Sequence, residues 1–420
     1  MARAFKVPNF YRSDTIAQIK LLRRTHDPKR RDFSPSELNF GPLVLRVARH
    51  FGFCFGVENA IEIAYRAVEE NPGKRIFLLS EMIHNPDVNA DLEQRGVKFL
   101  MSPDGTEQIP FDSLKPDDIV IVPAFGTTVQ LQGRLSAIGI DPYYYDTTCP
   151  FVEKVWRRAE ELGRDGFTVV VHGKRTHEET RATFSHSECA APTLVILDMS
   201  DAIFLVDYIS GTRSTAEFWD RFANGVSDGF DPQIHLKRIG VVNQTTMLAT
   251  ETHAIAETIR SGMLKKYGAE LLKEHFADTR DTLCYATNEN QNSTKDLIKA
   301  GADMAVVVGG YNSSNTSHLV ELCEESMPTF YVKNAGEIIN EHRIRHFDLQ
   351  AKDVIETEGW LPPATTENPL IVAITSGASC PDRTVDDVIT RIAELIPGCL
   401  NSSVAVENYR SRLESTLSIP

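Results

Sequence analysis

The chain has 420 residues and a formal net charge of −14, and 42% of its residues are hydrophobic, 24% charged and 8% aromatic. This length predicts two to four compact domains, the composition is that of a globular protein, and the acidic balance argues against nucleic acid as a partner. The longest apolar runs have the length of strands, so no membrane span is predicted. Because the N-terminus also lacks the pattern of a secretory signal, we interpret the chain as cytoplasmic rather than plastid stromal.

Residues 1–43 are predicted to form an N-terminal extension, since they are polar and basic, with Lys and Arg clustered in DPKRRDF. From residue 44 onward, short apolar strands alternate with amphipathic helical patterns, which is typical of parallel sheets with crossover helices. Strands are predicted at 75–80, 118–124, 167–173, 238–244, 303–310 and 369–377. The sequence therefore predicts an α/β fold with small, mostly parallel sheets.

Three cysteines directly precede helical patterns. DTTCPFVEKV (146–155) and DTLCYATNENQ (281–291) share Asp-Thr-x-Cys, and FGFCFGVENAI (51–61) is a looser copy. In the first of these, threonine suits the N-cap and proline the first helical turn, so Cys149 is predicted at a helix start, where a thiolate is favoured.

The recurrence of this pattern predicts three similar α/β lobes, each of which contributes one cysteine to a common point. The predicted lobes are 44–148, 149–283 with an insertion at about 200–235, and 284–420 with a C-terminal tail. Thiolates are ligands for iron–sulfur clusters, Zn²⁺ or Cu(I), and three protein ligands leave one metal position open for chemistry. The alternative is that Cys54, Cys149 and Cys284 are three independent core residues.

The other cysteines give no second ligand motif. Seven scattered cysteines argue against a disulfide framework, and the missing C-x-x-C pair argues against a local zinc knuckle. We predict that Cys189, Cys323 and Cys399 serve in packing. Cys380 lies beside a candidate anion-binding loop and is the residue most easily mistaken for a fourth ligand.

Two polar loops between a strand and a helix are candidate anion sites. GGYNSSNTS (309–317) offers Asn312, Ser313, Ser314 and Asn315, and TSGASCPD (375–382) offers Ser376 and Ser379. Hydroxyl, amide and N–H donors at a helix start suit a phosphate group. Ordinary capping and turn formation is the alternative for either loop alone.

Histidine, glutamate and threonine follow other predicted strands. EMIHNPDV places His84 at a strand-to-turn junction, and HGKRTHEETRAT places His177 and Glu179 at the entrance to a helix. A histidine two residues from a carboxylate can transfer protons near neutral pH, although a surface position is the alternative. VVNQTTMLATE adds Gln244, Thr245 and Thr246 after a further strand.

The ordered set GFCFGVENAI, EMIHNP, DTTCPFVEKV, HGKRTHEETRAT, NQTTM, DTLCYATNENQ, NSSN and TSGAS, over roughly residues 45–395, resembles the motifs of the LytB family. These are the 4-hydroxy-3-methylbut-2-enyl diphosphate reductases, the last enzymes of the non-mevalonate (MEP) isoprenoid pathway. The resemblance implies three α/β lobes around a central iron–sulfur cluster. It also implies an oxidoreductase that removes the substrate's hydroxyl by two-electron reduction, which gives isopentenyl and dimethylallyl diphosphate.

The resemblance also implies a role for each matching residue. A 4Fe–4S cluster, one per chain, would be held by Cys54, Cys149 and Cys284. The diphosphate of the substrate would be bound by His84, His177, Ser313, Ser314, Asn315 and Ser379. Glu179 would supply protons, with His177 beside it and Thr245 near the hydroxyl end of the substrate. The resemblance implies ferredoxin or flavodoxin as the electron donor. From the charge and the short apolar runs, neither nucleic acid nor a membrane is predicted as a partner.

Some features depart from the common family pattern. Many members carry a histidine where this chain has Phe125. That phenylalanine, the N-terminal extension and the insertion resemble the cyanobacterial and plastid type of the family.

Two alternatives for the same fold are a non-catalytic metal- or anion-binding module and a zinc hydrolase with a Cys₃ site.

Overall fold

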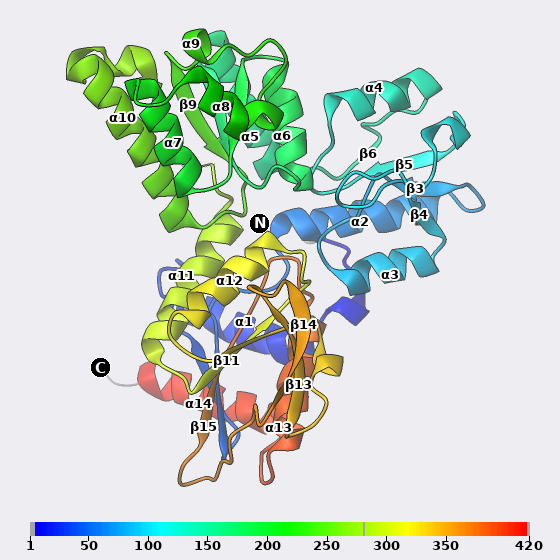
Figure 1. Ribbon diagram of the computed structural model, residues 1–420. Coiled ribbons are helices and arrows are strands. Elements are labelled where there is room, and N and C mark those ends of the chain that lie inside the picture. The colour runs from blue at the N-terminus through cyan, green and yellow to red at the C-terminus, as the bar shows by residue number, and fades with distance from the viewer. Residues whose placement is uncertain (1–4, 280–281, 418–420) are drawn as a thin grey trace. The chain divides into compact units, whose positions relative to one another are not determined.

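The computed structural model in Figure 1 describes residues 5–279 and 282–417. The chain divides into two compact units. Unit 1 contains the chain up to Glu58, His84–Pro86 and the chain from Tyr285 onward, and unit 2 contains Asn59–Ile83 and Asp87–Cys284. Both units place helices on parallel sheets, which confirms the predicted α/β class with small, mostly parallel sheets. No helix in the described part of the chain is long and apolar enough to cross a membrane.

The sheet of unit 1 has the strand order β1-β2-β15-β11-β12, and only the β1–β2 pair is antiparallel. Its strands are β1 (Ser36–Asn39), β2 (Leu43–Val47), β11 (Met304–Val308), β12 (Thr329–Val332) and β15 (Leu370–Ser376). A separate antiparallel hairpin is formed by β13 (Arg343–Asp348) and β14 (Asp353–Glu358).

Helices cover both faces of this sheet because its central strands are apolar on both sides. Val306 and Val308 of β11 pack in a core with α1, α13 and α14, whereas Ala305 and Val307 pack in another core with α11 and α12. The bounds of these helices are α1 (Asp14–His26), α11 (Tyr285–Ala300), α12 (Ser314–Glu324), α13 (Asp382–Leu395) and α14 (Ser402–Leu417).

Unit 2 contains two parallel sheets, with strand orders β10-β9-β7-β8 and β4-β3-β5-β6. The strands of the first are β7 (Thr168–His172), β8 (Thr193–Ile196), β9 (Ile239–Asn243) and β10 (Phe276–Ala277). Those of the second are β3 (Ile76–Leu78), β4 (Val97–Phe99), β5 (Ile119–Val122) and β6 (Tyr145–Asp146).

The first sheet of unit 2 carries α5 and α6 in one core and α7, α8 and α10 in another, and α7 lies beside α10 in Figure 1. The bounds are α5 (Pro150–Arg164), α6 (Glu178–Glu188), α7 (Met199–Ser210), α8 (Thr215–Phe222), α9 (Pro232–His235) and α10 (Ala249–His275). With the second sheet lie α2 (Phe55–Glu70), α3 (Pro86–Gln94) and α4 (Val129–Ile138). Short 3₁₀ turns are η1 (Asn9–Tyr11), η2 (Phe111–Ser113), η3 (Ala223–Gly225) and η4 (Ala335–Glu337).

Three features of the fold go beyond the sequence-based description. Strand β2 pairs with β15, and not with the strands between residues 76 and 146. The apolar sequence of β2 predicts that it is buried but does not specify its partner strand. The N-terminal segment is part of unit 1 and not an appendage, since Ile16 and Ile19 of α1 are buried in its core. The insertion at about 200–235 forms α7, α8 and α9, and Phe218 of α8 is fully buried. The division into three lobes stays a prediction.

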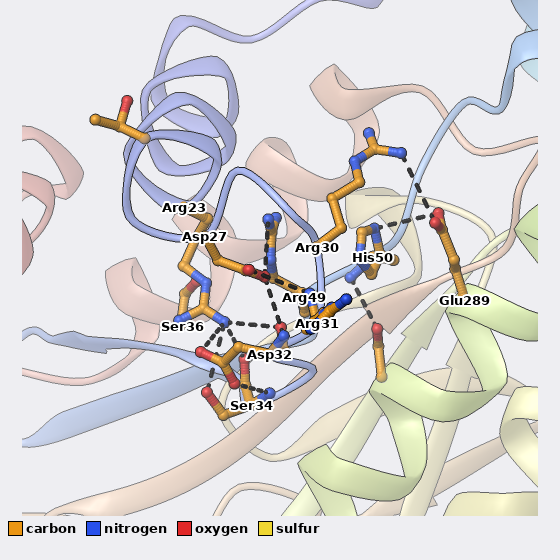
Figure 2. Close-up of polar contacts among 12 residues, drawn as sticks. Arg23, Asp27, Arg30, Arg31, Asp32, Ser34, Ser36, Arg49, His50 and Glu289 are labelled. Carbon is orange, nitrogen blue, oxygen red and sulfur yellow. Dashed lines mark hydrogen bonds and ion pairs between the residues drawn. The ribbon is translucent and has the colours of Figure 1, made fainter.

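A cluster of polar residues in unit 1 surrounds the buried His50, as Figure 2 shows. The backbone N–H of His50 donates to Ser293 Oγ (3.1 Å), and its Nδ1 lies 3.4 Å from Glu289 Oε2. Burial, and then the positive charges of nearby residues, lower the pKa of His50 to about 4; these residues are Arg49, Arg30, Lys20 and Arg23. Burial also raises the pKa of Glu289. His50 is therefore neutral in the folded chain at pH 7.

We expect this neutral histidine to make folding pH-dependent. The unfolded chain takes up a proton at His50 below about pH 6.5, whereas the folded chain does so only near pH 4. The free energy of unfolding should therefore fall between pH 6.5 and 4, by up to about 3 kcal/mol from this group, partly offset by the raised pKa of Glu289. Urea unfolding from pH 7 to 4.5 measures it. His50→Gln should flatten the slope and the exposed His342→Gln should not; equal slopes in all three proteins would contradict the assignment.

Candidate functional site

The candidate residues of unit 2 follow the carboxyl ends of its parallel strands, where α/β proteins place their sites. Cys149 comes three residues after β6, His177 and Glu179 follow β7, and Thr245 follows β9. Strands β7 and β9 are buried along their whole length, and the candidate residues follow where these strands end. The parallel order of β9 and β7 brings two of these loops to one edge of the sheet.

Cys149 is itself the N-cap of α5, with Pro150 in the first turn, and its carbonyl accepts from Val152 N (2.8 Å). The prediction that Cys149 starts a helix is confirmed, but the expected threonine cap is wrong. Thr148 instead donates through its N and Oγ1 to Asp146 Oδ1, at 2.8 and 2.5 Å. Thr148 therefore forms an Asx-type turn with Asp146 and does not cap the helix, and Cys149 occupies the N-cap position.

Burial, with smaller contributions from neighbouring Cys284 and Glu179, raises the pKa of the Cys149 thiol to about 11. The helix start alone therefore does not produce a thiolate here, because the cost of burying a charge exceeds the favourable helix dipole. A thiolate at this position needs a positive partner such as a metal centre.

Glu179 is 1% exposed, and Thr245 binds both of its carboxylate oxygens. Thr245 N donates to Oε1 (2.6 Å) and Thr245 Oγ1 donates to Oε2 (2.9 Å). The carbonyl of Thr245 in turn accepts from Cys284 N (3.2 Å). The structure thus brings together Glu179, Thr245, Cys284 and Cys149, which the sequence had placed in four separate motifs.

His177 caps α6, and its Nδ1 accepts from Glu179 N (3.2 Å). This hydrogen bond fixes Nδ1 as the acceptor and leaves Nε2 as the protonated nitrogen in the neutral ring. The ring of Phe125 packs edge-on against that of His177, with centroids 5.6 Å apart. Phe125 therefore packs against a candidate site residue.

Gln244 is more central to this region than its weak sequence pattern indicated. It is fully buried, and its Oε1 accepts from Thr180 Oγ1 (2.9 Å) and Lys174 N (3.2 Å). Its Nε2 donates to Thr246 Oγ1 (2.7 Å). Gln244 therefore ties the loop after β9 to the loop before α6, which no local pattern could reveal.

The candidate anion loops of unit 1 lie side by side because β11 and β15 are adjacent parallel strands. Ser313 caps α12 by accepting from Thr316 N (3.3 Å), which is the capping role that the sequence analysis gave as the alternative for this loop. Asn315 Oδ1 accepts from Ala378 N (2.9 Å), and Ser379 Oγ donates to the carbonyl of His84 (3.1 Å). Ser313, Asn315, Ser379 and His84 therefore belong to one group, and Ser314 is the first residue of α12.

This group in unit 1 holds donors that have no protein partner. Asn315 is 4% exposed, yet its Nδ2 is buried without a hydrogen-bond partner, as is Ser376 Oγ. The Oδ1 atom of Asn315 also accepts from Asn290 Nδ2 (3.4 Å). Asn290 is a residue that the sequence analysis did not single out. A buried amide donor without a partner is costly unless a ligand accepts from it. The arrangement suits an anionic ligand.

Cys54 belongs to the same unit as these loops. Its backbone N–H donates to the carbonyl of Ala378 (3.2 Å), the residue before Ser379. Cys149 and Cys284 belong to unit 2, so the meeting of the three cysteines stays a prediction. Among the described residues, no three His, Cys, Asp or Glu side chains within reach of one another could hold a metal ion.

The other cysteines differ in their surroundings. Cys323 and Cys380 are fully buried in apolar cores. Cys399 packs at the edge of the core that contains Cys380, as predicted. Cys189 is exposed at the end of α6, so its predicted packing role is wrong. It is the C-cap residue after α6, and its thiol donates to the carbonyl of Ser185 (3.2 Å).

Comparison with known proteins identifies the family. The family model described as "LytB protein" matches residues 45–393. A 4-hydroxy-3-methylbut-2-enyl diphosphate reductase of Synechococcus sp. (strain ATCC 27144 / PCC 6301 / SAUG 1402/1) is 43% identical over 359 residues, covering 85% of this chain and 87% of the relative. The enzyme of the same name from Thermosynechococcus vestitus is 41% identical, covering 84% and 85%.

The solved structure of the E-1-hydroxy-2-methyl-but-2-enyl-4-diphosphate reductase from Plasmodium falciparum has a similar fold. It aligns with a TM-score of 0.57 and 20% sequence identity, covering 82% of this chain and 86% of that chain. At this identity the likeness concerns the fold alone. The family match, which spans most of the sequence, and the two relatives show that the chain belongs to the LytB protein family.

Proposed function

We propose that this chain is an oxidoreductase that converts 4-hydroxy-3-methylbut-2-enyl diphosphate to isopentenyl and dimethylallyl diphosphate, the last step of the MEP pathway. The observation that carries the proposal is the match to reductases at 41–43% identity over about 85% of the chain. The reaction takes up two electrons and protons and releases the substrate's hydroxyl as water. The chain therefore needs an electron-transfer group, a proton donor and a diphosphate site.

The electron-transfer group is an iron–sulfur cluster. We assign to it the 4Fe–4S type, one per chain, with Cys54, Cys149 and Cys284 as ligands. The donor set fits such a group, because each of these cysteines directly precedes a helix and the buried Cys149 thiol needs a positive partner to ionise. When bound, a cluster with three protein ligands supplies electrons and one open iron position.

Glu179 is the proton donor in this proposal, and Thr245 and His177 are the residues that orient it. The two hydrogen bonds from Thr245 hold the carboxylate in one orientation, and the bond from Glu179 N to His177 Nδ1 fixes the ring beside it. A carboxyl group that is 1% exposed exchanges protons with the substrate rather than with bulk water.

The diphosphate is bound by neutral donors, in agreement with a chain of net charge −14. We assign this role to His84, His177, Ser313, Ser314, Asn315 and Ser379. The buried Asn315 Nδ2 without a protein partner supports the assignment, since a phosphate oxygen would accept from it. Phe125 packs edge-on against the ring of His177.

We propose ferredoxin or flavodoxin as the electron donor and the cytoplasm as the location.

The alternatives of a non-catalytic binding module and a Cys₃ zinc hydrolase predict different chemistry. Neither accounts for a buried glutamate that lies beside two cysteines and is oriented by a threonine.

The decisive experiment is an anaerobic visible spectrum of the purified full chain, combined with a turnover assay with the diphosphate substrate and a chemical reductant. We expect a brown protein with broad absorption near 400 nm, as is typical of iron–sulfur clusters, and formation of both isomeric products. A colourless protein that binds zinc and hydrolyses a substrate would favour the hydrolase. A coloured protein without turnover would favour the binding module.

A further inference from the structure

The loop that carries Cys54 is contacted by residues of the N-terminal segment on both sides of the cysteine. The ring of Tyr11 lies edge-on to Phe53 with centroids 5.9 Å apart, and the ring of Phe5 lies edge-on to Phe55 at 4.9 Å. Tyr11 and Phe5 are only 5% and 7% exposed, so both rings are packed in place. The residues directly before and after Cys54 are therefore each held by one aromatic contact.

A third contact holds the beginning of the same loop. Lys20 Nζ of α1 lies 4.6 Å from the ring centroid of Phe51 and 2.6 Å from Asp382 Oδ1 of α13. A Cβ at Gly52 would lie 2.6 Å from that carboxylate oxygen and 3.1 Å from Lys20 Nζ, and Gly52 also has a φ of +79°. Glycine is thus required where the lysine–aspartate pair approaches the loop.

Polar groups of the segment contact the chain just before the loop, as Figure 2 shows. The carboxylate of Asp27 lies 4.0 Å from the guanidinium of the buried Arg49. Arg30 Nη1 lies 3.7 Å from Glu289 Oε1, and the other oxygen of Glu289 faces His50 Nδ1. The first contact places a carboxylate beside the buried cation Arg49, and the second links Arg30 through Glu289 to the neutral His50. The N-terminal segment therefore also contacts the chain at residues 49 and 50.

The N-terminal segment is itself anchored in the core of unit 1. Ile16 and Ile19 of α1 are 0% and 2% exposed, and Ser13 Oγ donates to Asp386 Oδ2 (2.7 Å). Because the segment is anchored, it can restrain a neighbouring loop. A flexible segment would itself lose conformational entropy on contacting the loop, and this cost would cancel the gain.

We propose that residues 5–32 are a positioning element for the cluster ligand Cys54: Phe5, Tyr11 and Lys20 contact Phe55, Phe53 and Phe51 and hold the cysteine loop in the conformation that binds the cluster. The proposal rests on the proposed function for the ligand role of Cys54, but the restraint of the loop exists in the cluster-free chain as well. Phe5, Tyr11 and Lys20 act through the loop and do not touch the reacting atoms.

The test uses the full chain with Tyr11→Ala, Tyr11→Phe and, as a control, Leu21→Ala at a 61% exposed position on α1. One readout is the rate at which a thiol reagent alkylates Cys54 in the cluster-free chain, followed by peptide mass spectrometry. Cys399, also half-buried in unit 1 but outside the loop, is the internal reference. The second readout is the rate at which a chelator bleaches the visible absorption of the cluster-loaded chain.

We expect Tyr11→Ala to speed alkylation of Cys54 about fivefold to tenfold, the scale of one lost aromatic contact, with Cys399 unchanged and Tyr11→Phe and Leu21→Ala like the parent chain. Bleaching should accelerate by a similar factor. An unchanged Cys54 rate, or Cys54 and Cys399 rates that rise together because unit 1 loosens as a whole, would overturn the proposal. If the chain holds no iron–sulfur cluster, the proposed function fails, whereas the alkylation arm still decides whether the segment restrains the loop.

Discussion

Replacing Glu179 with glutamine is expected to lower the turnover number by at least about 100-fold, the scale of general acid catalysis, while the visible spectrum stays unchanged. Glutamine has the same shape, and its oxygen can still accept from Thr245 N while its amide faces Thr245 Oγ1. The fold and the cysteines are therefore preserved, and only the transferable proton is lost. Steady-state kinetics with a chemical reductant and the anaerobic spectrum together measure the effect.

Glu178→Gln is the matched control for this variant. Glu178 is the preceding residue on α6 and is similarly buried, but its carboxylate accepts from Ser80 Oγ (2.9 Å), and a glutamine oxygen can replace it. We expect this variant to keep most of its turnover. Full turnover in Glu179→Gln, or an equal loss in both variants, would remove Glu179 from the role of proton donor.

Replacing Cys149 with serine is expected to abolish the brown colour and to lower turnover by about 100-fold or more, because a hard oxygen is a poor ligand for iron–sulfur clusters. Serine is a favourable N-cap, so α5 should still begin at Pro150 and the melting temperature should change little. Iron and sulfide analysis of the anaerobically purified variant measures the loss of the cluster.

Cys189→Ser is the control for the thiol substitution, since Cys189 is exposed in the same unit and its removal should leave colour and turnover unchanged. A Cys149→Ser protein with full colour and full activity would show that this cysteine is not a ligand. A variant that loses its melting transition would be uninformative about ligation, and Cys284→Ser then serves as the second test of the same centre.

Much of the local structure could be predicted from the sequence, because strands and helix starts depend on residues that are neighbours in the chain. The apolar runs at 167–173 and 303–310 form β7 and β11, and Cys149 lies at the start of α5. Ser313 acts as a helix cap for the same reason. Whether Thr148 or Cys149 caps α5 depends on the Asp146 carboxylate, which accepts hydrogen bonds from Thr148. Although Asp146 is only two residues away, the sequence does not show which turn forms there.

The candidate site could be predicted as a set of residues but not as a set of contacts. The recurrence of Asp-Thr-x-Cys and the family resemblance singled out Glu179, Thr245 and the cysteines. The two hydrogen bonds between Glu179 and Thr245 join residues 66 positions apart. Gln244 and Asn290 were missed or given little weight because their partners, Thr180 and Asn315, come from other elements.

The sequence by itself determined the class of fold, the helix-start cysteines and the family, since these depend on local periodicity and on ordered motifs. Only the tertiary structure decided that β2 pairs with β15, that α1 belongs to the core of unit 1, and that Phe5, Tyr11 and Lys20 contact the Cys54 loop. The physical reason is that an apolar face or an aromatic ring specifies that it will be buried but not against which partner. That choice depends on the packing of segments that lie far apart in the chain.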